Sequence, residues 1–433
     1  MGKKKKIKKA KLKKKDKGEN TETVYNLTEN SLRRRSSIFP CKDFEKLQTD
    51  ENYRDFLKVY PQRWWLLYTV IFLNIANYAH WVAFPSVAKI AAKYYKQSEE
   101  RLDYIPTISY AFGVPFCLVS TYIVEEYGLK VGLHIGGYLT GIGGLMCFAS
   151  SSPFLGDYIS DFGKYYLALV GQALTGIASP FISCMPTKIS QNWFSDKQRM
   201  LATILLGMSN PLGIILGQFL TPRFVLEPSH IPLMNFTWFC PACLGAILTL
   251  VKVKSDIPPT PPSKSAFTSK LKGTESQDYL LTTKDLFTNW PFIILFVFMG
   301  GCMGYLSSIS TKMEQILSAK GYSNQFAGLC SALIFLAGFI TSFPFGLISS
   351  KLKKPVLVCK AATLVAIPTF LLINYYMKAE NEGVIILVSC GLLGTFMIGP
   401  YPIALELLVE STYPTNEVHF LINKNYIYIH IFF

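Results

Sequence analysis

Apolar residues in this 433-residue chain gather in ten long runs that are separated by shorter polar segments. A helix of about 20 apolar residues crosses the hydrocarbon core of a bilayer, and each run reaches that length. The pattern therefore predicts an all-α polytopic membrane protein. The expected spans are roughly residues 64–88, 104–124, 130–150, 163–186, 200–221, 232–252, 291–311, 325–348, 356–377 and 384–408.

The longest polar segment between two runs is rich in proline, serine and threonine, which is typical of a linker without its own core. It separates six expected spans from four. We therefore predict five parts: a disordered basic arm (1–62), a six-helix half (63–252), a cytoplasmic linker (253–290), a partial half of four helices (291–417) and an atypical tail (418–433).

A short repeat supports this division. PFCLVST (Pro115 to Thr121) lies in the second expected span, and PFGLISS (Pro344 to Ser350) lies in the eighth. Each segment therefore falls in the second span of its own half. This placement favours a duplicated six-helix unit, as in transporters that are built from repeats.

The first expected span breaks its apolar pattern with NIANYAHW (Asn74 to Trp81). On a helical wheel Asn74, Asn77, Tyr78 and Trp81 share one face of about 100°, with His80 at its edge. Polar groups placed this deep usually face a bundle interior or a cavity. We expect this face to line the path of a polar solute. The alternative is that these groups pair with a neighbouring helix.

The net charge of +15 comes mostly from the N-terminal arm, which has ten lysines in its first fifteen residues. We interpret the arm as disordered. A more specific interpretation is that it is attracted to anionic lipid, with about 1 kcal/mol per basic residue. The arm does not indicate a nucleic-acid partner. Of the 43 lysines and arginines, 19 precede the first span, so the N-terminus is expected to be cytoplasmic. The plasma membrane is expected ahead of an internal membrane, and the oligomeric state stays open.

Enzymatic motifs are absent from the sequence: it contains no HExxH, GxSxG or GxxxxGK[ST]. The ten cysteines are scattered, mostly inside apolar runs, which indicates packing rather than a disulfide framework. We expect no enzyme activity, no cofactor and no metal site. Transport by such a chain would be driven by gradients, since no nucleotide site is recognisable.

Several motifs together resemble one family. They are RWWLLYTVIFLN followed by Trp81, YGLK, GQAL, MSNPLG, PPTPPS, MEQIL with GLCSALIF, and ELLVESTYP. The stretch from Arg63 to Glu417 is similar to the feline leukaemia virus subgroup C receptor-related group of major facilitator proteins, solute carrier family 49. MSNPLG, PPTPPS and MEQIL point to its member-3 branch. The resemblance implies the major facilitator fold, with two six-helix halves.

The resemblance also implies a substrate class, because relatives have been linked to choline-type quaternary amines and to haem. Trp81 would face a bound cation, and His80 would be the haem ligand if haem is carried. Gln172 matches the GQ of span four, and Ser179 stands where relatives tend to have a glutamine. Ser307 stands where some have a span-seven tyrosine, with Tyr305 two residues earlier.

The loop after the second span contains Glu125, Gly128 and Lys130. It resembles the acidic–glycine–basic loop that major facilitator proteins carry between helices two and three. The resemblance implies a conformational latch, in which charged groups bond a neighbouring helix in one state only. The alternative is that any short loop at a membrane surface carries charge.

The family pattern stops after TNE, and the tail VHFLINKNYIYIHIFF consists mostly of residues with AT-rich codons. We interpret the tail as translated non-coding sequence that replaces two further spans. The expected function is therefore secondary transport of a small organic solute by alternating access. The alternative is a ten-span scaffold, or a regulator of a full-length partner, without transport activity.

Overall fold

The computed structural model describes residues 58–152, 158–183, 185–263, 289–377 and 382–410. Residues 1–57 of the basic arm, most of the linker and the atypical tail therefore lie outside the described residues. Ten helical segments are long and apolar enough to cross a membrane, so the ten expected spans and the all-α class are confirmed. No strand occurs within these ranges.

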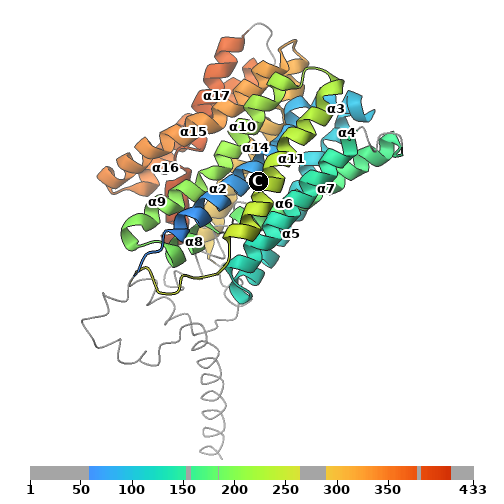
Figure 1. Cartoon of the computed structure of the whole chain (residues 1–433). Coiled ribbons are helices and arrows are strands. Elements are labelled where there is room, and N and C mark those ends of the chain that lie inside the picture. Colours follow the sequence, from blue (N-terminus) through green and yellow to red (C-terminus); the bar gives the residue numbers. More distant parts are fainter. Residues whose placement is uncertain (1–57, 153–157, 184, 264–288, 378–381, 411–433) are drawn as a thin grey trace, which may run out of the picture.

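Six spans come from the N-terminal half (Figure 1). The first is α2 (Gln62–Ala83), which continues through the 3-10 turn η3 (Pro85–Val87) into α3 (Ala88–Tyr95). Pro85 explains the change of helix type, because it has no backbone N–H to donate to the preceding turn. The remaining elements are α4 (Glu99–Leu102), α5 (Tyr104–Glu126), α6 (Leu129–Ser151), α7 (Asp161–Ser183), α8 (Pro186–Trp193), α9 (Asp196–Gly207), α10 (Ser209–Phe224), η4 (Pro228–His230) and α11 (Ile231–Lys252).

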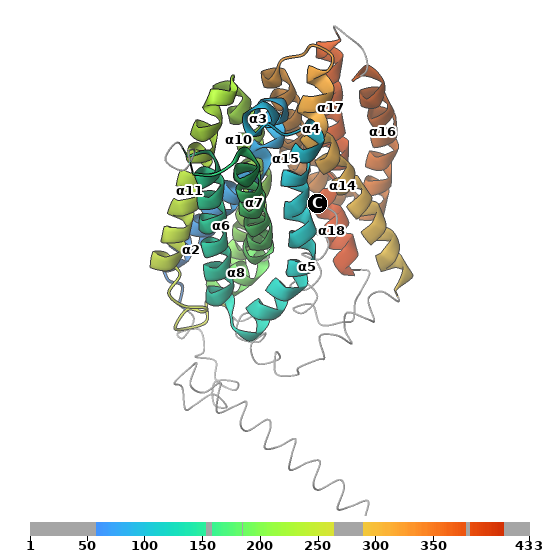
Figure 2. The same ribbon diagram turned by 90° about the vertical axis from the view of Figure 1, so that its right-hand side faces the viewer.

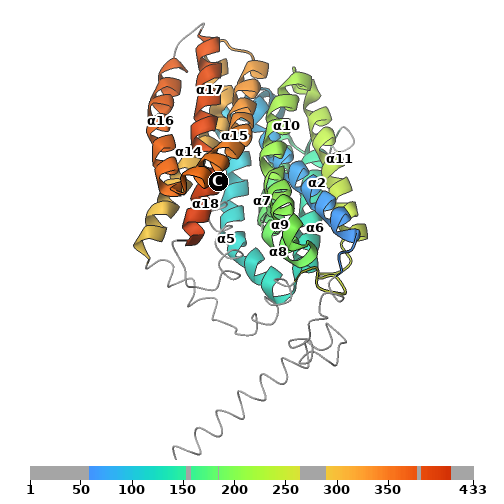
Figure 3. The ribbon, with the colours of Figure 1, turned by 90° about the vertical axis from the view of Figure 1, so that its left-hand side faces the viewer.

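The C-terminal half contributes four spans, and the last of them is broken. Its elements are α14 (Trp290–Ser318), α15 (Asn324–Leu352), α16 (Pro355–Tyr376), α17 (Gly383–Met397) and α18 (Tyr401–Glu410). The turn between α17 and α18 contains Gly399 and Pro400, the two residue types that most disfavour a continuous helix. The two halves stand side by side in Figures 2 and 3.

The repeated segments occupy equivalent places, since Pro115 lies inside α5 and Pro344 lies inside α15. Each of these second helices is followed by a residue with left-handed backbone: Gly128 has φ +97° and Lys353 has φ +51°. Gly128 is the residue before α6, whereas Lys353 is the C-cap of α15 in the left-handed αL conformation, so the two helices end differently.

Small residues bring helices of the N-terminal half into backbone contact. A Cβ added at Gly213 would lie 2.7 Å from the Ile75 carbonyl oxygen, and one at Gly217 would lie 2.8 Å from that of Ala79. Glycine pairs of this spacing let membrane helices approach closely. Here they press α10 against α2 and so fix the helix that carries the polar face.

The two halves meet near one end of the bundle, which we call the η3 end. There Gln218 of α10 donates to the Ser310 hydroxyl at 3.3 Å. Asp103 accepts from Gln315 at 2.8 Å and forms an ion pair with Lys312. These hydrogen bonds join described residues of the two halves at this end. The opposite end, where residues 253–263 lie, is called the linker end.

Candidate functional site

The five residues of the predicted polar face of α2 are all buried, with exposed fractions of 7% or less: Asn74, Asn77, Tyr78, His80 and Trp81. Polar groups removed from water need hydrogen-bond partners. The neighbours of each side chain therefore decide whether it supports the helix bundle or lines a cavity.

Asn74 supports a break in the fifth span. Its side-chain amide donates to the Ser209 hydroxyl at 2.8 Å and to the Asn210 side chain. The break separates α9 from α10 at Met208, and Pro211 contributes to it by removing a backbone donor. Asn74 thus pairs with a neighbouring helix, which is the alternative left open by the sequence.

His80 and Gln172 form a second structural pair, between α2 and α7. The Gln172 amide donates to the His80 carbonyl oxygen at 3.1 Å, and the same nitrogen lies 3.3 Å from His80 Nδ1. Neither residue lines the two cavities that are described below. Gln172 therefore contacts α2 rather than the cavity, and its backbone carbonyl accepts from Ser109 at 2.9 Å.

The other three residues of this face meet at a small cavity between α2, α5 and α7. The volume of this cavity that the centres of water molecules can occupy is about 30 Å³. This is enough for one or two waters. Its lining is aromatic and neutral: Asn77, Tyr78, Trp81, Ser109, Tyr110, Thr175, Gly176 and Ser179.

Three aromatic rings form one wall of this cavity. The centroids of Trp81 and Tyr110 are 5.1 Å apart at an interplanar angle of 72°, and those of Tyr78 and Trp81 are 6.4 Å apart at 85°. Such edge-to-face pairs add about 0.5–1.5 kcal/mol beyond area burial. The Trp81 indole N–H is directed to the Pro106 carbonyl oxygen at 3.4 Å, so the ring orientation is fixed by α5.

The polar wall is held by hydrogen bonds within the N-terminal half. The Asn77 amide donates to the Thr175 carbonyl oxygen at 3.1 Å and to the Thr140 hydroxyl at 3.2 Å. Ser179 donates to the Tyr78 hydroxyl at 3.4 Å. Asn77 and Ser179 therefore line the cavity while also joining α2 to α6 and α7.

The C-terminal half supplies the opposite side of this region. Ser307 of α14 faces the Tyr110 hydroxyl. Tyr305 points elsewhere, because its hydroxyl accepts from Asn374 at 2.9 Å and its ring lies 4.6 Å from that of Phe370. Of the two span-seven candidates, only Ser307 approaches the aromatic wall.

Sequence reasoning missed Tyr110 and Tyr401. Both rings lie next to Tyr78, and Tyr110 lines the cavity itself. A tyrosine inside an otherwise apolar span is a usable signal, since its hydroxyl needs a partner or a cavity. What the sequence could not supply was the pairing of span two with span one at this depth.

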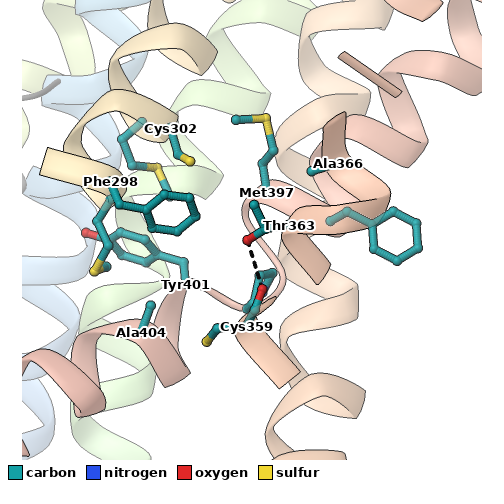
Figure 4. Close-up of a pocket in the computed structure, with 12 residues that line it drawn as sticks. Phe298, Cys302, Cys359, Thr363, Ala366, Met397, Tyr401 and Ala404 are labelled. Carbon is teal, nitrogen blue, oxygen red and sulfur yellow. Dashed lines mark hydrogen bonds between the residues drawn. The ribbon is translucent and has the colours of Figure 1, made fainter. Parts of the chain in front are cut away.

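A second cavity of about 40 Å³ lies within the C-terminal half, between α14, α16 and the turn that joins α17 to α18 (Figure 4). Its lining is apolar and rich in sulfur. The Thr363 hydroxyl donates to the Cys359 carbonyl oxygen at 2.8 Å. Met303 and Tyr401 line this cavity and also pack with Tyr78 and Trp81 in one core cluster.

The loop after α5 is bound by the start of the linker. The Lys130 backbone N–H donates to Asp256 Oδ1 at 2.6 Å, and the Trp193 indole donates to the Asp256 carbonyl oxygen at 3.2 Å. A Cβ at Gly128 would lie 2.5 Å from the Asp256 carboxylate. Gly128 and Lys130 therefore contact their own half through Asp256; the side chain of Glu125 lies outside what is described.

Metal chemistry finds no support in this part of the chain: no group of three or more His, Cys, Asp or Glu residues converges among the described residues. The eight described cysteines are unpaired.

Comparisons with known proteins agree with this architecture. The profile of the Major Facilitator Superfamily matches residues 65–423. Solute carrier family 49 member A3 of Xenopus tropicalis is 33% identical over 364 residues, which cover 83% of this chain and 73% of the relative. Choline/ethanolamine transporter FLVCR2 of Homo sapiens is 26% identical and covers 83% of this chain and 68% of its own length. The crystal structure of a D-xylose-proton symporter superposes with a TM-score of 0.62 at 16% identity, over 86% of this chain and 88% of that one.

Proposed function

Since this chain belongs to the Major Facilitator Superfamily and to its solute carrier family 49, close to the member-3 branch, we propose that it transports a small choline-like quaternary amine. Transport would proceed by alternating access, with the cavity around Trp81 as the binding site. Asn77, Tyr78 and Ser179 would complete that site from the N-terminal half, and Ser307 would approach it from the C-terminal half.

The observation that carries this proposal is the chemistry of the cavity lining. Three aromatic rings stand beside neutral amide and hydroxyl groups, and no charged side chain lines it among the described residues. A quaternary ammonium cannot donate a hydrogen bond from its nitrogen, so it is recognised by ring faces, with about 2 kcal/mol or more per desolvated contact. Relatives at 26% identity bear the name choline/ethanolamine transporter, which supports the same substrate class.

Haem is the weaker substrate candidate. It would need an axial ligand and basic partners for two propionates. His80 faces Gln172 rather than the cavity, and the cavity lining contains no lysine or arginine. We therefore favour the choline-like cation.

The cavity has room for only one or two waters, so the solute must enter in another conformation. Hydrogen bonds between described residues of the two halves gather at the η3 end, which supports a state that is closed there. With a cytoplasmic N-terminus in the plasma membrane, as the basic arm suggests, the η3 end would face outward. This state would then exchange solute with the cytoplasm.

Uptake of radiolabelled choline by the full chain in proteoliposomes tests the proposal. We expect accumulation above empty liposomes that saturates and is reduced by unlabelled choline. Ethanolamine and haem are the comparison solutes. A correctly inserted protein that gives no saturable choline uptake would overturn the proposal and favour the ten-span scaffold.

A further inference from the structure

Glu314 lies buried in the last turns of α14 and takes no part in the proposed binding site. It is 2% exposed, and neither carboxylate oxygen has a side-chain hydrogen-bond partner; the nearest donor is the backbone N–H of Lys89. A carboxylate that loses water and gains at most one neutral donor is strongly disfavoured. Something other than a neighbouring side chain has to neutralise it.

The position of Glu314 ties it to the contact between the two halves. Two residues before it, Lys312 pairs with Asp103, and one residue after it, Gln315 donates to the same carboxylate at 2.8 Å. Asp103 precedes α5 in the N-terminal half. The turn of α14 that buries Glu314 is therefore the turn that closes the η3 end.

Charged groups around Glu314 do not complete an ion pair with it. Lys89 of α3 and Glu99 of α4 face it electrostatically, but no Lys or Arg side-chain nitrogen among the described residues lies within 4.0 Å of its oxygens. η3 contains no charged residue, and neither does α15 from Asn324 to Ser350. Lys312 is already paired with Asp103, and α18 packs on the other end of α14, where Leu408 meets Phe292.

We propose that Glu314 is a proton-binding site whose occupancy controls closure of the η3 end. With that end open, water would hydrate the carboxylate and exchange its proton. A proton taken from water converts the carboxylate to a neutral carboxylic acid, which can be buried between the halves at lower cost. On reopening, the proton returns to water. The inference rests on the alternating-access part of the proposed function.

A proton fits this site better than a metal cation. Sodium and divalent ions need several oxygen ligands, and Glu314 belongs to no group of three or more converging His, Cys, Asp or Glu residues in the described ranges.

The test reads conformation and needs no solute, so it stands apart from the choline assay. Ser86 lies in η3 and is 2% exposed. The substitution Ser86→Cys in the full chain makes this position the reporter. The unaltered protein is measured alongside, so that labelling of the native cysteines can be subtracted. A membrane-impermeant maleimide labels the reporter when the η3 end opens. We expect severalfold more labelling at mildly alkaline than at mildly acidic pH.

Glu314→Gln is then added to the Ser86→Cys protein. Because glutamine is neutral at every pH, maleimide labelling should stay at all pH values at the low level that is expected at acidic pH. The matched control Glu99→Gln, on an exposed neighbour, should keep the pH response. A Glu314→Gln protein with an unchanged pH response would overturn the proposal. Labelling that follows sodium at constant pH would overturn the proton as the ligand.

If Glu314→Gln does not fold, infrared difference spectra of the unaltered protein between the two pH values provide the test. A carbonyl band of a protonated carboxyl group is expected, and Glu314→Asp should shift it. Absence of a band that responds to this substitution contradicts the proposal. Choline uptake can fail while this band persists, so the two claims fail separately.

Discussion

The ring of Tyr110 stands edge-on to the indole of Trp81 with 5.1 Å between their centroids. Trp81 comes from α2 and Tyr110 from α5, and the indole N–H is directed to the Pro106 carbonyl oxygen of that same helix. The aromatic wall is thus made by two helices of one half, held in a fixed relative position. Ser307 of the other half faces the Tyr110 hydroxyl, so this wall is where movement between the halves would change the cavity.

Gly176 tests the close approach of α7 to α5 at the cavity. A Cβ there would lie 2.4 Å from the Ser109 carbonyl oxygen, a backbone atom that cannot rotate away. Gly176→Ala should destabilise the fold by about 1–3 kcal/mol through overpacking and lower the melting temperature in detergent. Gly301→Ala is the matched control, because nothing lies within 4 Å of its added Cβ. Equal melting temperatures for both variants would refute the packing described.

Asp256 tests how the loop after α5 is held. Its carboxylate accepts the Lys130 backbone N–H at the start of α6, as an N-terminal cap does. Asp256→Ala should cost about 0.5–2 kcal/mol of stability, measured by thermal unfolding. Lys130→Gln keeps the backbone donor and should leave the transition unchanged. If Lys130→Gln destabilises as much as Asp256→Ala, the lysine charge acts directly, as the latch hypothesis from the sequence requires.

Gln172 separates support of α2 from contact with the solute. Gln172→Leu removes the donor to the His80 carbonyl oxygen, and a buried acceptor without a partner costs about 1–3 kcal/mol. We expect a lower yield of folded protein and a choline KM close to that of the unaltered chain, since Gln172 does not line the cavity. A KM raised tenfold in the folded fraction would instead assign Gln172 to the binding site.

Much of the fold could be predicted from the sequence, because each span is defined by local hydropathy. The ten spans follow from local patterns. Contacts between residues far apart in the sequence could not be predicted in this way. Asn74 shares a helical face with Trp81, yet its side-chain amide donates to Ser209 at the break between α9 and α10. The break exposes polar groups that need a donor.

The candidate site was predictable in part for the same reason. Asn77, Tyr78, Trp81 and Ser179 line one cavity, whereas His80, Gln172 and Tyr305 contact neighbouring helices instead. A helical wheel gives the direction of a side chain but not which helix stands opposite. Tyr110 and Glu314 can be noticed as polar residues in apolar spans, but only the packing of the helices reveals what surrounds them.

Choline uptake by Trp81 variants tests the central claim most directly. Trp81→Ala removes the indole face, and a loss of about 2 kcal/mol or more corresponds to about thirty-fold weaker binding, so uptake at low choline should be abolished. Trp81→Phe keeps a ring and should retain part of it. Trp65→Ala, on a side chain 59% exposed, controls for general damage to the membrane helix, with insertion confirmed by surface labelling. Normal choline uptake by correctly inserted Trp81→Ala protein would contradict the account.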